Sequence, residues 1–176
     1  MTRWDRRIER ALELETQYPA AAELLRFYRR VAQASWPVLP EPYAPAPFPP
    51  GFIERVKGPI QPCTEHQPLC AVLRPEGEGA KRFLLCAVCS HEWEFNRIRC
   101  PACGNEDKDT LPVFTAEQFP HIRVEACDAC HTYLKSIDLT KNGLAVPEVD
   151  EIASVSLDLW AAEHSYTKLH PNLLGL

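Results

Sequence analysis

Six of the eight cysteines form three pairs with the spacing Cys-x-x-Cys. Two intervening residues allow one tight turn, a knuckle, to aim both sulfurs at a single metal ion, which supplies half of a tetrahedral site. Gly104 directly follows the second pair and accepts the positive φ that such a turn requires. The spacing therefore predicts metal binding by Cys86 and Cys89, Cys100 and Cys103, and Cys127 and Cys130.

Three knuckles make one and a half sites, and Cys63-Thr64-Glu65-His66 offers the missing half with histidine as its second ligand. Between His66 and Cys86 lie 19 residues, and between Cys103 and Cys127 lie 23, which suits hairpins joining the knuckles of zinc ribbons. Pairing consecutive knuckles closes shorter loops than crossed pairing. We therefore predict one site of Cys63, His66, Cys86 and Cys89, and another of Cys100, Cys103, Cys127 and Cys130.

Cys70 is left over from this scheme. It either replaces His66 as the fourth ligand or packs as a small buried apolar residue, and we favour His66 because its spacing needs only the turn. Three thiolates and an imidazole suit zinc, whereas four thiolates accept zinc or iron. Both sites are filled by protein ligands, so we expect two structural metal ions, zinc at both, with iron as the alternative at the second.

Four side chains on strands beside the knuckles are candidate partner-binding residues: Glu92, Trp93, Tyr133 and Lys135. Tryptophan and tyrosine are frequent interface anchors, although packing across the hairpins is the alternative explanation. The sequence contains no recognisable nucleophilic triad, paired catalytic carboxylates or phosphate-binding glycine loop. We therefore expect a protein that is not an enzyme.

The elements that must position these ligands follow from periodicity. Apolar residues recur at helical spacing on both sides of Pro19, which predicts two helices within residues 2–35. Prolines crowd the following segment and exclude helix and sheet interior there. Strands are indicated at 71–74, 81–85, 91–99, 111–117, 121–125 and 132–138, and one helix at 148–165 opens after Pro147.

These elements predict an α+β fold with an N-terminal helical hairpin, tandem rubredoxin-like or zinc-ribbon β-hairpin units and a C-terminal helix. We assign the helical hairpin to residues 1–35, a proline-rich connector to 36–62, the tandem metal-ribbon domain to 63–140, and the C-terminal helix and tail to 147–176.

Charge and hydropathy exclude several classes of function. The net charge of −5 disfavours nucleic acid, because binding phosphates takes an excess of lysine and arginine. The N-terminus lacks the apolar core of a secretory signal, and no stretch reaches the roughly 18 apolar residues of a membrane span. We therefore expect a cytoplasmic protein, in which paired cysteines bind metal more often than they form disulfides.

Several segments resemble the FdhE-type formate dehydrogenase accessory proteins. The resemblance is specific over residues 63–166, and three of its segments are 82–104, 125–135 and 150–159. It implies two rubredoxin-like metal sites under a helical domain, and binding to the catalytic subunit of a formate dehydrogenase. Two departures are the proline-rich connector, which stands where the family has further helices, and His66, which stands where the family has cysteine.

The resemblance implies a maturation factor that binds the catalytic subunit of formate dehydrogenase or a related metalloenzyme during assembly. Two alternatives are a small redox protein with an iron–thiolate centre at Cys100, Cys103, Cys127 and Cys130, and a zinc-ribbon interaction module.

Overall fold

The computed structural model describes residues 3–35, 67–87, 90–172 and 174–175. The proline-rich connector and three of the predicted ligands, Cys63, His66 and Cys89, lie outside these residues. What the sequence predicts for them therefore stays a prediction.

Two helices form the N-terminal part, as the sequence predicts. Helix α1 (Arg3–Gln17) is followed by the short 3-10 helix η1 (Pro19–Ala21) and by α2 (Ala22–Ser35). Pro19 fits the first position of η1, where its missing N–H costs no hydrogen bond. The apolar faces of α1 and α2 pack on each other through Leu14, Leu25 and Tyr28, and onto a third helix through Ile152.

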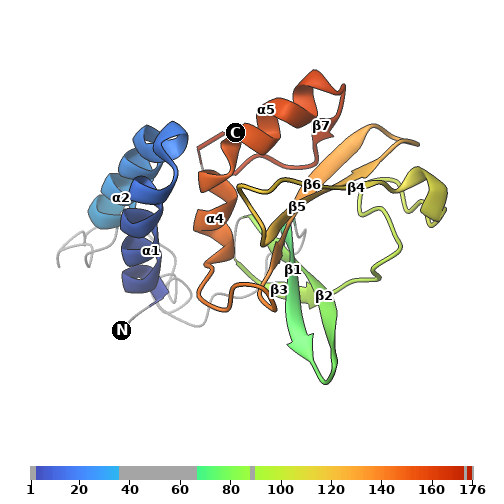
Figure 1. Ribbon diagram of the computed structural model, residues 1–176, viewed down its shortest axis with the longest axis horizontal. Coiled ribbons are helices and arrows are strands. Elements are labelled where there is room, and N and C mark those ends of the chain that lie inside the picture. Colours follow the sequence, from blue (N-terminus) through green and yellow to red (C-terminus); the bar gives the residue numbers. More distant parts are fainter. Residues whose placement is uncertain (1–2, 36–66, 88–89, 173, 176) are drawn as a thin grey trace, which may run out of the picture.

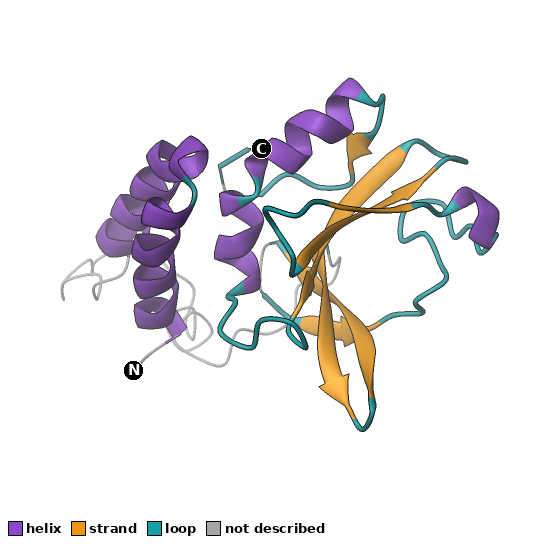
Figure 2. Ribbon diagram, in the orientation of Figure 1, coloured by secondary structure: helices purple, strands orange, loops and turns teal. Residues whose placement is uncertain are grey.

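The seven strands form one mixed sheet (Figure 2). Its order is β3-β2-β1-β6-β5-β4, and β7 pairs with β6 beyond the end of β1. The pairs β1–β6 and β6–β7 are parallel, and the others are antiparallel. The strands are β1 (Pro68–Glu76), β2 (Gly79–Cys86), β3 (Glu92–Glu94), β4 (Val113–Thr115), β5 (Ile122–Cys127), β6 (Thr132–Asp138) and β7 (Thr167–Lys168), with a 3-10 turn, η2 (Lys108–Thr110), before β4.

The two hairpins predicted as tandem units share this sheet. Residues 70–73 of β1 pair in parallel with residues 135–138 of β6, which joins β1–β2 to β5–β6. The first half of β1 is apolar and buried throughout, so it needs cover on both faces and a partner on each edge. The strand predicted at 91–99 is shorter than expected, because Asn96 accepts a hydrogen bond from the Ile98 amide and turns the chain.

The single C-terminal helix predicted at 148–165 is wrong, because the structure has two helices there. Helix α4 (Pro147–Ala153) and helix α5 (Val155–Glu163) meet at Ser154. The Ser154 hydroxyl donates to the carbonyl oxygens of Asp150 and Glu151, both at 3.0 Å. A serine that bonds back to the preceding turn competes with the helix and bends it.

Helices α4 and α5 lie along one face of the sheet, and the hairpin α1–α2 packs on the outer side of α4 (Figure 1). Tyr133, Val124 and Ile122 point from the sheet toward α5, where Leu157 and Ala161 meet them. The opposite face carries the alternate residues of the same strands. No helix in the described ranges is long and apolar enough to cross a membrane.

Candidate metal centre

Four cysteines from two distant knuckles meet at one point. The Sγ atoms of Cys100, Cys103, Cys127 and Cys130 all lie within 4.8 Å of one another. Cys100 Sγ is 3.7 Å from Cys130 Sγ, and Cys103 Sγ is 3.8 Å from Cys127 Sγ. A tetrahedral ion with metal–sulfur bonds of about 2.3 Å holds its sulfurs about 3.8 Å apart. The geometry of the second predicted site therefore fits a tetrahedral metal ion.

The backbone turn of the Cys100–Cys103 knuckle is a tight hairpin. The Cys100 amide donates to the Asn105 carbonyl oxygen at 2.8 Å, and the Gly104 amide donates to the Cys100 carbonyl oxygen at 3.0 Å. Gly104 has φ of +76°, as its place after the second cysteine predicts. In the other knuckle the His131 amide donates to the Cys127 carbonyl oxygen at 2.8 Å, and His131 has φ of +55°. His131 therefore occupies the position of Gly104.

Two backbone hydrogen bonds of the same kind are present after β2. The Ser90 amide donates to the Cys86 carbonyl oxygen at 3.0 Å, and the Cys86 amide donates to the His91 carbonyl oxygen at 2.9 Å. Ser90 has φ of +55°, matching His131. These bonds flank residues 88–89, so the backbone on both sides follows the knuckle pattern. Cys86 is thus held in the way that a metal ligand in a knuckle is held.

Cys70 has a different environment. It is fully buried in β1, in an apolar cluster with Val72, Leu85 and Ile137. Burial raises the pKa of its thiol well above the ordinary value, and the nearby Glu151 raises it further. Such a thiol stays protonated and packs as a small apolar residue, which is one of the two roles that the sequence leaves open.

The thiols of the four-cysteine cluster shift one another's pKa in opposite directions: the neighbouring thiols raise that of Cys103 and lower that of Cys130. At Cys103 the Asn105 amide lowers the pKa, but desolvation and the other thiols raise it to about 12. At Cys130 desolvation raises the pKa, but the Thr132 hydroxyl and amide lower it to about 7. The Thr132 Oγ1 atom lies 2.8 Å from Cys130 Sγ. Because crowded thiolates repel, a cation that displaces the protons is the natural counter-charge.

The four predicted partner-binding residues divide into two groups. Glu92 receives two hydrogen bonds from Arg74, at 2.6 and 2.7 Å, and Trp93 is half-buried at the edge strand β3. Tyr133 and Lys135 are only 3% and 0% exposed. The expectation of a partner surface is therefore wrong for Tyr133 and Lys135, because their strand face is covered by helices α4 and α5.

Lys135 belongs to a buried network of charges that the sequence does not reveal. Its ammonium lies 2.6 Å from Asp158 Oδ2 and 2.9 Å from Glu151 Oε1, and it donates to the Glu151 carbonyl oxygen at 2.5 Å. Glu151 also pairs with Lys168 and accepts from Asn172 at 2.8 Å. Burial raises the pKa of Glu151, but the two lysines outweigh it and hold the pKa below its ordinary value. The network fastens β6 and β7 to both C-terminal helices.

Asp150 makes a second junction, between α1, α4 and the sheet. Its carboxylate accepts from Arg10 of α1 at 2.6 and 3.0 Å and lies 2.9 Å from His121 Nε2. It also accepts from the Val146 amide at 2.8 Å. Burial raises the pKa of Asp150, but the bonds from His121 and Arg10 lower it overall. The N-terminal helices are thereby joined to the part of the chain that carries the cysteines.

A mixed sheet, covering helices and four clustered thiols define an α+β protein with a candidate metal centre between two knuckles. Residues 98–174 match the family described as "FdhE, C-terminal domain". The match includes all four clustered cysteines and the carboxylates Asp150, Glu151 and Asp158.

Curated relatives agree with this family. The chain is 47% identical over 98 residues to "Protein FdhE homolog" of Aquifex aeolicus, covering 56% of this chain and 34% of that protein. It is 33% identical over 115 residues to the homolog of Shewanella oneidensis, covering 64% and 37%. The crystal structure of the FdhE protein from Pseudomonas aeruginosa aligns with a TM-score of 0.55 and 31% identity, over 61% of this chain and 37% of that chain. The matched part thus spans little more than a third of these relatives.

Proposed function

We propose that this chain is an accessory factor that binds the catalytic subunit of formate dehydrogenase, or of a related metalloenzyme, during assembly in the cytoplasm. The observation that carries the proposal is the FdhE C-terminal domain match over residues 98–174. The arrangement of the centre supports a role without catalysis, because four thiolates complete a tetrahedral metal site and leave no ligand position for substrate.

The metal ion of this centre has a structural role, because its ligands come from two separate segments of the chain. Cys100 and Cys103 lie in the long loop between β3 and β4, whereas Cys127 and Cys130 lie at the turn between β5 and β6. A bound zinc or iron ion would fasten the loop to the hairpin, and Asn105 adds a donor 3.7 Å from Cys127 Sγ. We propose a second ion held by Cys63, His66, Cys86 and Cys89, which the knuckle turn at Cys86 supports.

Metal analysis of the purified full chain tests the structural part. We expect two zinc ions per chain, and one fewer in the variant Cys103→Ala, whose ribbon region should unfold because metal binding supplies folding free energy. The matched control is Cys70→Ala, which should keep both ions. Equal metal content and equal melting in Cys103→Ala and the unsubstituted chain would overturn the assignment of the second site.

Affinity purification from the native host tests the accessory role. The tagged chain is recovered gently from cells induced for formate dehydrogenase, beside the variant Cys130→Ala, which lacks a ligand of the same centre. We expect a dehydrogenase catalytic subunit with the first protein and much less with the variant. Recovery of the chain alone in inducing conditions would contradict the proposal.

One observation favours a second candidate, a small redox protein. Cys103 is exposed, so an iron ion held by these four thiolates would lie near the surface, where electrons can enter. Protein purified with iron, coloured and reversibly reducible would support this function, whereas colourless protein that holds only zinc would exclude it.

A further inference from the structure

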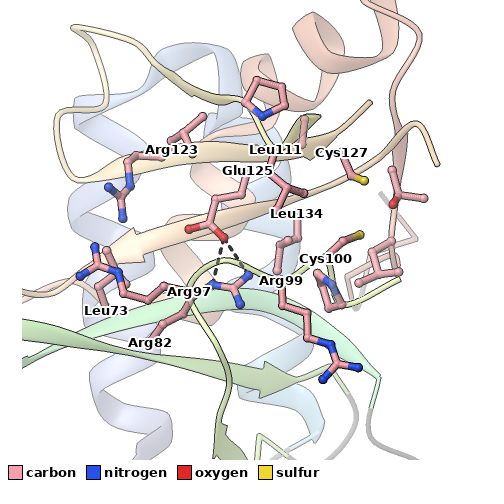
Figure 3. A pocket seen from close by; sticks show the side chains of 16 residues that line it. Leu73, Arg82, Arg97, Arg99, Cys100, Leu111, Arg123, Glu125, Cys127 and Leu134 are labelled. Atoms are coloured by element: carbon pink, nitrogen blue, oxygen red, sulfur yellow. Dashed lines mark hydrogen bonds and ion pairs between the residues drawn. The ribbon is translucent and has the colours of Figure 1, made fainter. Parts of the chain in front are cut away.

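The sheet face opposite α4 and α5 contains a hollow lined by arginines (Figure 3). Its cavity volume is about 120 Å³, which is room for roughly four water molecules or one small anionic group. Strands β1, β2, β5 and β6 form its floor, and the loops around residues 97–101 and 111–113 form its rim. We call it the arginine hollow, after Arg82, Arg97, Arg99 and Arg123, which line it together with Glu125.

One of these arginines is already neutralised. Arg82 is 3% exposed and donates to Glu125 Oε2 through Nε at 3.0 Å and through Nη2 at 2.8 Å. Its third contact is the Asn96 carbonyl oxygen, at 3.0 Å. Glu125 is the only carboxylate that lines the hollow in the described part of the chain, and Arg99 Nε lies 3.7 Å from Glu106 Oε1, so Arg97 and Arg123 leave the hollow positively charged. This excess is local, because the whole chain has a net charge of −5.

Arg123 brings a donor that the protein does not use. Its Nε atom is buried and has no hydrogen-bond partner within the ranges that the structure describes. Ser136, its cross-strand neighbour on β6, has a buried Oγ atom that also lacks a partner there. Buried polar atoms are normally paired, and of these two residues only Arg123 lines the hollow, so its unmet donor is the one that indicates a ligand.

The thiolates of the metal centre do not account for all of this charge. Cys100 and Cys127 line one end of the hollow, and Arg99 lies against the turn at Gly104, 3.6 Å from a Cβ built there. Arg99 can therefore compensate the anionic centre. Figure 3 shows the guanidinium groups of Arg97 and Arg123 together at the other end, away from the two sulfurs. Within the described part of the chain, Arg97 donates one hydrogen bond, to the Ala80 carbonyl oxygen at 3.3 Å.

We propose that the arginine hollow binds an oxyanion, a carboxylate or phosphate group, between Arg97 and Arg123. A guanidinium presents its donors in a planar fork that matches two oxygens of such a group, and Arg123 Nε would gain the acceptor that it lacks. The Arg82–Glu125 pair forms the fixed wall of the site. This inference concerns the chain by itself and does not depend on binding to a formate dehydrogenase.

Calorimetric titration of the metal-loaded full chain tests the proposal, with inorganic phosphate and a short glutamate-rich peptide as separate probes at constant ionic strength. We expect saturable binding of at least one probe, and the tighter probe identifies the source of the oxyanion. Arg123→Gln and Arg97→Gln should each weaken it tenfold or more. Arg26→Gln, the same charge change on α2, should leave it unchanged.

Two additional measurements distinguish loss of binding from loss of folding. Metal content and melting are measured for every variant, and Arg97 is exposed, so Arg97→Gln folds even if Arg123→Gln does not. Arg123→Lys keeps the charge but loses the fork, and should bind between the unsubstituted chain and Arg123→Gln. Absence of saturable binding for both probes, or equal weakening by Arg26→Gln, would overturn the proposal.

Discussion

Replacing Lys135 with methionine tests the largest difference between the sequence-based expectation and the structure. The sequence places Lys135 beside a knuckle as a candidate partner contact, whereas the structure buries it completely. Methionine keeps most of the length and apolar volume of the side chain and removes only the ammonium. The carboxylates of Glu151 and Asp158 then lose a partner at 2.9 and 2.6 Å.

The expected loss of stability follows from what remains around the two carboxylates. Removing one partner of a buried ion pair costs about 3–5 kcal/mol, because the other charge stays buried. Lys168 still pairs with both carboxylates, and Asn172 still donates to Glu151, so we expect the lower end, about 3 kcal/mol. For a chain of this size that corresponds to a melting temperature lower by about 6–12 °C.

Thermal and urea unfolding of the zinc-loaded protein at pH 7 measures the effect. The matched control is Lys81→Met, whose ion pairs with Glu76 and Glu94 lie at the surface, where solvent screens them, so this change should leave the melting temperature almost unchanged. If the free energy of unfolding of Lys135→Met lies within about 1 kcal/mol of that of the unsubstituted chain, the account of the network is refuted. Unchanged melting with loss of a co-purifying dehydrogenase would instead restore Lys135 as a partner contact.

Three further predictions concern the knuckles and the helix junction. Gly104→Ala should destabilise the zinc-loaded protein by about 1–2 kcal/mol in urea unfolding, and Gly143→Ala by less, because only Gly104 has positive φ although both have room for a Cβ; equal losses would contradict this. The pKa of Asp150 lies below its ordinary 3.8, so its stabilisation is complete above that pH and is lost as pH falls through the folded-state value. The stability gap between the unsubstituted chain and Asp150→Asn should therefore close in acid, and a gap independent of pH would count against the junction. His66→Ala should cost one metal ion in elemental analysis and Cys70→Ala none, and the reverse result would make Cys70 the ligand.

The sequence predicts most of the local structure because its signals are local. Helical periodicity on both sides of Pro19 gives α1 and α2, and β6 spans the same residues as its prediction. The second metal site is also predictable, since the knuckle spacing and Gly104 together define the turn. In each case the physical determinant lies within a few residues of the position it governs.

The features that the sequence does not predict depend on residues that are far apart along the chain. A lysine on a strand is normally solvated, and only carboxylates 16 and 23 residues further along the chain make the interior position of Lys135 favourable. The parallel pairing of β1 with β6 joins segments more than sixty residues apart. The arginine hollow arises only after this pairing, because Leu73 and Arg82 from the first hairpin and Arg123 from the second then share one sheet face.

Two knuckle turns and the backbone on either side of residues 88–89 show how the fold and the candidate metal chemistry depend on each other. Two of them hold a non-glycine residue, Ser90 and His131, at φ of +55°, a conformation that costs free energy unless the surroundings enforce it. At His131 the enforcement is visible, since Cys127 and Cys130 converge with the other knuckle on one point. The same backbone at Ser90 has the same cost and needs a comparable compensation. A metal ion at Cys86 would supply it, and this is the strongest structural support for the first predicted site.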